Sequence, residues 1–311
     1  MKILIMGAGA VGGYFGARLQ AAGEQAVFCA RGDNLRALRE HGIEITSIRG
    51  DLKLAVTATD APRTHAPYDL VLFAVKFYGL EPAARQLDGC LRPGGAILSL
   101  LNGVESEARL AEIFGRESVM GGNARLGVEL VAPGRIAHIS TGHIEFGELD
   151  GRISQRAREY AAAFERAGIL GALSDRIMTI RWDKLIWNSA FNTVTTLTRR
   201  TVGEILDDPE GLELVTTLMR ETLRVAQAEG AQLGEDRVEA FLLHSQKNLR
   251  ALKTSTLQDL ERGKPLEYEA LSGAVLRGAR RHRIAVPMTQ TVYALLKLLD
   301  GSRSSSAEQR R

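Results

Sequence analysis

The sequence has few of the residues that build disulfides, metal sites and membrane spans. It contains only two cysteines, Cys29 and Cys90, which match no metal-ligand spacing and suit a reducing compartment. Its six histidines are scattered, with no H-E-x-x-H motif or close pair, so we expect no metal site. No apolar run approaches the length that spans a bilayer. We therefore expect a cytoplasmic protein with no membrane partner.

The sequence also lacks a large excess of positive or negative residues. Lys and Arg total 40 against 37 for Asp and Glu, a net charge of +3, and residues 302–311 supply two of those charges (three Arg, one Glu). The rest of the chain is nearly neutral, so we expect no nucleic-acid partner. We interpret the basic helix end formed by Arg277, Arg280, Arg281 and Arg283 as a solvated face. A chain of 311 residues is long enough for two domains.

What the chain does have, at its start, is an apolar run followed by a glycine turn. Residues 3–6 predict a buried parallel strand, and Gly7, Gly9 and Gly12 follow as G-x-G-x-x-G. Residues 11–22 then show helical spacing and end at Gly23. Strand, glycine turn and helix in this order predict a dinucleotide-binding unit, with the pyrophosphate at the helix N-terminus. The candidate cofactor-binding residues of the turn are Gly7, Ala8, Gly9, Ala10, Val11 and Gly12.

Three further side chains follow expected strands at the edge where a dinucleotide binds. Arg31 ends the second strand, where NAD-binding units usually carry an acidic residue; its guanidinium favours the 2′-phosphate of NADP. The neighbouring Asp33 is the residue that would support NAD instead. Lys76 ends a strand over residues 69–75, and Asn102 follows one over residues 96–101. A solvated lysine and an Asn-Gly turn remain the alternatives for these two positions.

The remaining periodicity predicts an α/β fold with two domains and a helical C-terminal half. We expect a dinucleotide-binding, Rossmann-like domain over residues 1–175, an all-helical substrate domain over residues 176–300, and a disordered tail over 301–311. A cleft between the two domains is the expected ligand site. Two or three short antiparallel strands are expected over 125–131, 136–140 and 143–147, and a last strand within 168–174. Helices are expected at 152–167, 175–197, 201–206, 209–229, 235–252, 265–282 and 287–299, the last one ending at Gly301.

Two polar groups in the helical half suggest chemistry. Lys184, Asn188 and Asn192 recur every four residues in an apolar-rich helix, so they follow one drifting face and could bind one small polar molecule. Ser255 and Glu267 belong to a second segment. Glu267 shares a helical face with apolar residues and should point inward, where a carboxylate needs a partner such as Lys184. A solvated stripe and a charge at a helix start are the alternatives.

These residues together resemble the ketopantoate reductases (2-dehydropantoate 2-reductases). The resemblance runs from Lys2 to about Leu298. Its more specific part is the K-x-x-x-N-x-x-x-N row together with the S-x-L-Q-D segment and the E-x-x-x-x-x-G segment that ends at Gly273. The motifs that carry it are Gly7 to Gly12, Arg31, Val75-Lys76, Asn102-Gly103, Trp182-Asp183-Lys184 with Asn188 and Asn192, Ser255 to Asp259, Glu267, and Ile284 to Pro287.

The resemblance implies an NADPH-dependent oxidoreductase that reduces ketopantoate to pantoate for pantothenate and coenzyme A synthesis. It implies that Lys184 is the catalytic acid and that Glu267 is its companion at the substrate. Asn102, Asn188, Asn192 and Ser255 match the family's substrate-binding positions, and Arg31, Lys76 and Asn102 match its contacts with NADPH/NADP+. The expected partners are a small 2-oxo acid and, at most, a second copy of the chain in a homodimer.

Two alternatives stay open. An asparagine common in the family shortly before the serine is replaced here by Ala251-Leu252-Lys253, and Thr198-Arg199-Arg200 follows the long helix where relatives carry smaller polar residues. These departures leave room for a sister NADPH-dependent reductase of another branched 2-oxo acid, since polar groups of a binding site set specificity. The second alternative is a redox sensor that binds NADPH without turnover.

Overall fold

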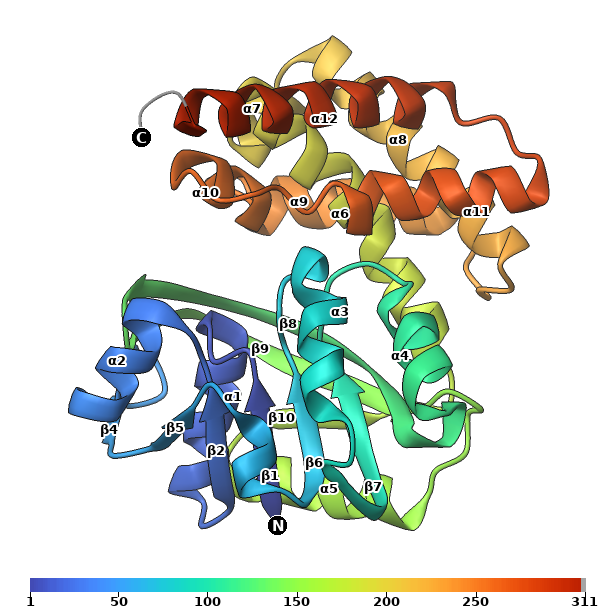
Figure 1. Cartoon of the computed structure of the whole chain (residues 1–311). Coiled ribbons are helices and arrows are strands. Elements are labelled where there is room, and N and C mark those ends of the chain that lie inside the picture. Colours follow the sequence, from blue (N-terminus) through green and yellow to red (C-terminus); the bar gives the residue numbers. More distant parts are fainter. Residues whose placement is uncertain (309–311) are drawn as a thin grey trace. The chain divides into compact units, whose positions relative to one another are not determined.

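The structure is a computed structural model that describes residues 1–308, apart from the side chains of residues 141 and 302–308. The chain forms two compact units. Unit 1 comprises Met1–Leu101 and Ser106–Ile177, and unit 2 comprises Asn102–Glu105 together with the chain from Met178 onward. Unit 1 contains the sheet and unit 2 is helical (Figure 1), which confirms the predicted α/β class with a Rossmann-like N-terminal part and a helical C-terminal part. No helix in the described chain is long and apolar enough to cross a membrane.

Unit 1 is built on a single sheet, in which the described chain places ten strands. Their order is β4-β3-β9-β8-β7-β6-β1-β2-β5, and β10 pairs with β9. The neighbours β5, β2, β1, β6 and β7 all run parallel, as expected for a dinucleotide-binding unit. The strands are β1 (Lys2–Met6), β2 (Gln25–Cys29), β3 (Ile43–Ser47), β4 (Leu52–Leu54), β5 (Thr57–Thr59), β6 (Tyr68–Phe73), β7 (Leu91–Ser99), β8 (Val119–Ala132), β9 (Arg135–Glu148) and β10 (Leu170–Leu173).

Helices bury the apolar side chains of this sheet. Phe15 of α1 and Phe164 of α5 are almost fully buried, and their rings meet edge to face 6.3 Å apart. The predicted end of α1 is confirmed, because Gly23 follows it with a left-handed φ of +93°. The α-helices of unit 1 are α1 (Ala10–Ala21), α2 (Gly32–His41), α3 (Leu80–Ala84), α4 (Ser106–Phe114) and α5 (Gln155–Arg166); short 3₁₀ turns are η1 (Pro62–His65), η2 (Phe77–Gly79), η3 (Arg85–Leu87) and η4 (Arg116–Ser118).

The prediction of two or three short antiparallel strands between residues 125 and 147 is confirmed as two antiparallel strands, but their extent was wrong. Strands β8 and β9 form one long antiparallel hairpin of 14 residues each, with register shifts near Gly127. Strand β9 continues through Gly142, where a Cβ would lie 1.8 Å from the carbonyl oxygen of Arg125. This glycine therefore allows the close approach of two paired backbones.

Unit 2 consists of helices around their own apolar clusters, one of which includes Phe191, Val215 and Phe241. The long helix expected from residue 175 is confirmed as α6 (Ile177–Thr198). The other helices of unit 2 are α7 (Val202–Leu206), α8 (Pro209–Ala228), α9 (Asp236–Asn248), α10 (Ser255–Glu261), the π-helical η5 (Glu269–Gly273), α11 (Ala274–His282) and α12 (Pro287–Glu308).

Three helix predictions in unit 2 need correction. Helix α10 was not expected; the Thr254 side chain caps it by accepting from the N–H of Leu257. The helix expected from residue 265 begins only at Glu269, and before it the N–H of Leu266 donates to the Asp300 carboxylate of α12. Helix α12 continues through Gly301, since glycine costs helix stability but keeps its backbone hydrogen bonds. It occupies residues 301–308 of the expected disordered tail, and residues 309–311 lie outside the described chain.

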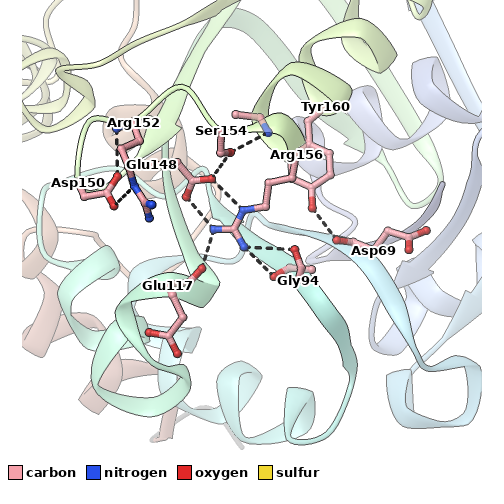
Figure 2. Close-up of polar contacts among 11 residues, drawn as sticks. Asp69, Gly94, Glu117, Glu148, Asp150, Arg152, Ser154, Arg156 and Tyr160 are labelled. Carbon is pink, nitrogen blue, oxygen red and sulfur yellow. Dashed lines mark hydrogen bonds and ion pairs between the residues drawn. The ribbon is translucent and has the colours of Figure 1, made fainter.

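The ion pair between Arg156 of α5 and Glu148 of β9 belongs to a network that also includes β7 and η4 (Figure 2). Arg156 of α5 donates from Nε and Nη2 to the two carboxylate oxygens of Glu148, at 2.8 and 2.7 Å. It also donates to the backbone carbonyls of Glu117, Gly94 and Gly95. The Glu148 hydrogen bonds raise the pKa of Arg156. A cavity of about 500 Å³ adjoins this network and is lined by residues 116–117, 148–150, 152–154 and 156, none of which belongs to the glycine turn.

Replacing Arg156 by Met should destabilise the protein by about 3 kcal/mol or more, the lower end for a buried pair that loses one partner. The physical reason is that the Glu148 side chain, 7% exposed, keeps its charge without its main donor. Urea unfolding of wild type and variant measures the change. Arg152→Met is the matched control, because its ion pair with Asp150 is exposed and should leave the midpoint nearly unchanged. Equal midpoints for both variants would contradict this account.

Candidate active site

The glycine turn between β1 and α1 has the predicted shape. Gly7 has a left-handed φ of +98°, and a Cβ there would lie 2.9 Å from the carbonyl group of Ala74. A Cβ on Gly12 would lie 2.3 Å from the Gly7 oxygen, so this glycine lets α1 pack against the turn. Around Gly9 a Cβ would meet no atom of the described residues within 4 Å. The turn is therefore closed where strand and helix pack and open where a pyrophosphate approaches.

Two residues that the sequence reasoning missed hold this turn in place. The Cys29 carbonyl accepts the N–H groups of Gly7 and Ala8, at 3.3 and 2.9 Å. Asn34 of α2 donates to the Ala8 carbonyl and accepts from the N–H of Gly134, both at 2.8 Å, so it joins the glycine turn to the β8–β9 turn. Burial raises the pKa of the Cys29 thiol to about 11, which keeps it neutral. No sequence motif marks Asn34; only its proximity to Arg31 hinted at a role.

The environment of Arg31 bears on the choice between the two nicotinamide cofactors. Arg31 precedes α2 with an exposed side chain that makes no hydrogen bond to the described residues. Asp33, the alternative ligand for an NAD ribose, forms an exposed ion pair with Arg36 at 2.6 Å. The exposed donors of the arginine suit a phosphate better than a ribose hydroxyl at this position.

Lys76 lies at the same edge of the sheet as the glycine turn. Met6, Phe73 and Ser99 form one row across β1, β6 and β7, which marks the carboxyl end of these parallel strands. The chain continues from β6 with the N–H of Ala74 donating to the Met6 carbonyl at 2.8 Å. Lys76 follows two residues later and is half-buried. Ligands of open α/β sheets bind outside this edge, so its position fits the predicted cofactor contact.

The polar row on α6 is embedded in protein. Lys184 is half-buried, whereas Asn188 and Asn192 are only 7% and 3% exposed. Within the described chain, neither amide side chain has a hydrogen-bond partner. The amide atoms keep access to solvent, because the fully buried side-chain atoms without a partner in the described chain are Glu107 Oε1 and Arg181 Nε, whereas a solvated stripe would be far more exposed. The row therefore has the character of a ligand-binding face, with two amides and one ammonium group on it.

Helix α10 begins beside the C-terminal end of this row. The Thr195 hydroxyl of α6 lies 2.7 Å from the hydroxyl of Thr254, the capping residue of α10. Thr195 is only about 20° around α6 from Lys184, at 100° per residue. Ser255, the first residue of α10, is exposed. Ser255 therefore lies at the start of α10, and the Thr195–Thr254 contact attaches this helix end to the face of α6 that bears the polar row.

Glu267 lies just before the π-helical turn η5 and points inward. Its side chain is 4% exposed, which confirms the predicted orientation, although the residue precedes the helix instead of lying in it. The Thr193 and Ser272 hydroxyls, 3.2 Å apart, connect α6 to η5. Burial raises the pKa of Glu269, but hydrogen bonds from Tyr293 and Arg277 outweigh it, so the pKa is lowered. An ion pair between Glu267 and Lys184 stays a prediction.

The last predicted residue, Asn102, belongs to unit 2. It is half-buried, and the following carbonyl, that of Gly103, accepts from Arg181 of α6 at 2.7 Å. Unit 2 thus contains all the predicted catalytic and substrate-binding residues, while the glycine turn, Arg31 and Lys76 lie in unit 1. Among the residues described, no group of three His, Cys, Asp or Glu side chains could hold a metal ion.

Both halves of the chain match family models of known proteins. Residues 3–151 match the model of ketopantoate reductase PanE/ApbA, and residues 176–300 match the model of its C-terminal part. The 2-dehydropantoate 2-reductase of Halobacterium salinarum is 32% identical over 302 residues, which cover 96% of this chain and 98% of that protein. The chain belongs to the ketopantoate reductase family. Family membership makes it a dinucleotide-binding oxidoreductase that acts on CH–OH groups.

Solved structures agree with this membership. The crystal structure of 2-dehydropantoate 2-reductase from Methylococcus capsulatus is 35% identical, has a TM-score of 0.88 and covers 98% of both chains. A structure of D-mandelate dehydrogenase with NADH and anilino(oxo)acetate has a TM-score of 0.92 over 98% of this chain at 22% identity. At that identity it shows only that the ketopantoate reductase fold is shared.

Replacing Gly9 by Ala should weaken dinucleotide binding without destabilising this ketopantoate reductase-family protein. Its φ of −82° suits alanine and its Cβ would meet no described atom, but it would occupy the space of the pyrophosphate. We expect an unchanged melting temperature and a Kd for NADPH or NADH raised about tenfold or more, the equivalent of 1.4 kcal/mol. Fluorescence titration measures the affinity. Gly12→Ala is the contrasting variant, since its Cβ clash should lower the melting temperature as well. Unaltered affinity in Gly9→Ala would refute the placement of the pyrophosphate.

Proposed function

We propose that this chain reduces 2-dehydropantoate (ketopantoate) to pantoate with NADPH, in pantothenate and coenzyme A biosynthesis. The observation that carries the proposal is the row on α6, where Lys184 is followed by two buried asparagines without protein partners. Relatives named 2-dehydropantoate 2-reductase support the same substrate. We assign nucleotide binding to residues 1–175 and substrate binding to residues 176–300, with Asn102 added to the second set.

In this proposal Lys184 is the catalytic acid. Its ammonium group donates a proton to the carbonyl oxygen of the 2-oxo acid as negative charge develops there. Glu267, a buried carboxylate, accepts a hydrogen bond from the substrate hydroxyl and keeps Lys184 oriented. The nicotinamide, when bound, supplies the hydride that reduces the carbonyl carbon.

The other polar residues of unit 2 orient the substrate. The amides of Asn188 and Asn192, which have no hydrogen-bond partner among the described residues, donate to its hydroxyl and carboxylate oxygens. Ser255 donates from the start of α10 to a carboxylate oxygen, where the helix N-terminus also favours negative charge. Asn102 binds both substrate and cofactor. Holding the ketone in one orientation lowers the entropic part of the barrier.

NADPH is the proposed cofactor because of the charges near the glycine turn. Arg31 offers an exposed guanidinium at the end of β2, and Asp33 is paired with Arg36. Lys76 adds a second cation at the carboxyl edge of the sheet. Two cations suit a cofactor with three phosphates better than one with two.

A sister reductase acting on another branched 2-oxo acid is the second candidate. Residues 251–253, which lack the family's asparagine, are exposed directly before the α10 cap. Arg199, at the end of α6, has a left-handed φ of 58° and an exposed side chain. Both features lie near the C-terminal end of the polar row, next to Ser255. They could therefore change which substituents of a 2-oxo acid fit at the substrate site.

Steady-state oxidation of NADPH and NADH with ketopantoate and a panel of 2-oxo acids tests the proposal. We expect the highest kcat/KM for ketopantoate with NADPH, since the polar row and Arg31 select them. A higher value for another branched 2-oxo acid would support the sister reductase. Equal affinity for NADH and NADPH would contradict the role of Arg31, and binding of NADPH without turnover of any acid would identify a sensor.

Replacing Lys184 by Ala should lower kcat by about 10²-fold or more, the lower end for a positioned proton donor. NADPH binding should survive, because the glycine turn is unaltered. Stopped-flow turnover and an NADPH titration measure the two quantities. Lys247→Ala, an exposed lysine on α9, is the control and should behave as wild type. Normal turnover of the Lys184→Ala variant would show that another group supplies the proton.

A further inference from the structure

The segment Asn102–Glu105 is attached to the helix that carries Lys184. Arg181 of α6, only 3% exposed, donates from Nη2 to the Gly103 carbonyl at 2.7 Å. Arg181 precedes Lys184 by three residues and lies about 60° from it around the helix. Val104, the next residue, is buried in an apolar cluster with Trp182 of the same helix. The backbone next to Asn102 is therefore attached to the first turns of α6, one turn from Lys184, through the Arg181 hydrogen bond.

The same segment also rests on the turn that follows Glu267. Gly103 has a left-handed φ of +88°, and a Cβ there would lie 2.3 Å from the Ala270 carbonyl oxygen. The N–H of Ala270 in turn donates to the Glu267 carbonyl at 3.1 Å. The turn is a π-helix closed by the N–H of Gly273 donating to the Tyr268 carbonyl, an irregularity that is frequent at functional sites. Only glycine allows two backbones to approach this closely.

A charged network fixes the far end of the segment. Arg277 of α11 donates to both carboxylate oxygens of Glu105, with the shortest contact 2.7 Å from Nη2. Its Nη1 donates to the Glu269 carboxylate at 2.7 Å, and Tyr293 of α12 donates to the other Glu269 oxygen at 2.7 Å. The Glu105 side chain is only 15% exposed. Bidentate Arg–carboxylate pairs fix geometry as well as adding attraction.

We propose that Glu105 is a positioning residue for Asn102, acting through Arg277. The inference rests on the proposed function, since it takes Asn102 as a substrate contact. Gly103, which follows Asn102, accepts a hydrogen bond from Arg181 and packs against Ala270. Glu105, three residues after Asn102, is bound to Arg277. Its amide is thereby held in a fixed place relative to Lys184 and Glu267. A pair that only stabilised the fold would affect melting but leave the kinetics of the folded enzyme unchanged.

Replacing Glu105 by Ala tests this directly. We expect kcat/KM for the 2-oxo acid to fall about tenfold to a hundredfold, the size that small misplacements of a contact produce. Glu105→Gln, which keeps an oxygen acceptor for Arg277, should recover part of the loss. Glu229→Ala is the matched control, because Glu229 binds Arg281, one turn further along α11, at 2.7 Å. This control should stay within about twofold of wild type, since surface pairs contribute little.

The outcomes separate the two proposals. If Glu105→Ala and Glu229→Ala have equal kinetics, the positioning role is overturned while the function stands. If the wild type reduces no 2-oxo acid, the proposed function fails, and amide hydrogen exchange of residues 102–105 tests the attachment alone. Faster exchange in Glu105→Ala than in Glu229→Ala supports that attachment, and equal exchange in the two variants overturns it.

Discussion

One constraint governs unit 2: two asparagine side chains on α6 are almost buried, yet their amides have no hydrogen-bond partner among the described residues. Asn188 and Asn192 are 7% and 3% exposed. Their amide atoms are not sealed from solvent, since the fully buried side-chain atoms without a partner in the described chain are Glu107 Oε1 and Arg181 Nε. The amides are therefore open to a polar ligand, and in the proposed function Lys184 on the same face supplies the charge that binds a 2-oxo acid.

Several elements of unit 2 are held around this face by polar contacts. The Thr195–Thr254 hydroxyl pair attaches α10, and the Thr193–Ser272 pair attaches η5. Arg181 attaches the segment that follows Asn102. Each contact joins α6 to an element that carries one proposed site residue. Hydrogen bonds have narrow distance and angle requirements, so they fix the site more sharply than apolar packing of α6 alone would.

The sequence predicted the dinucleotide-binding unit well because its constraints are local. Gly7, Gly9 and Gly12 each have a backbone requirement that the strand–turn–helix order makes readable, and the four-residue spacing of the polar row defines a helical face. Long-range contacts escaped prediction. Asn34 reaches the glycine turn from another helix, and the N–H of Leu266 is bound by Asp300, which lies 34 residues further along the chain. Gly301 misled for a related reason, since neighbouring helix turns decide whether a glycine ends a helix.

A crystal structure with NADP+ and a bound 2-oxo acid analogue would show whether the polar row on α6 binds the substrate. The proposed function predicts ligand oxygens within hydrogen-bond reach, about 2.6–3.2 Å, of Lys184 Nζ and of the amide groups of Asn188 and Asn192. It would be contradicted by a ligand bound elsewhere, with both asparagine amides hydrogen-bonded to protein groups and the Lys184 ammonium directed away from the carbonyl oxygen.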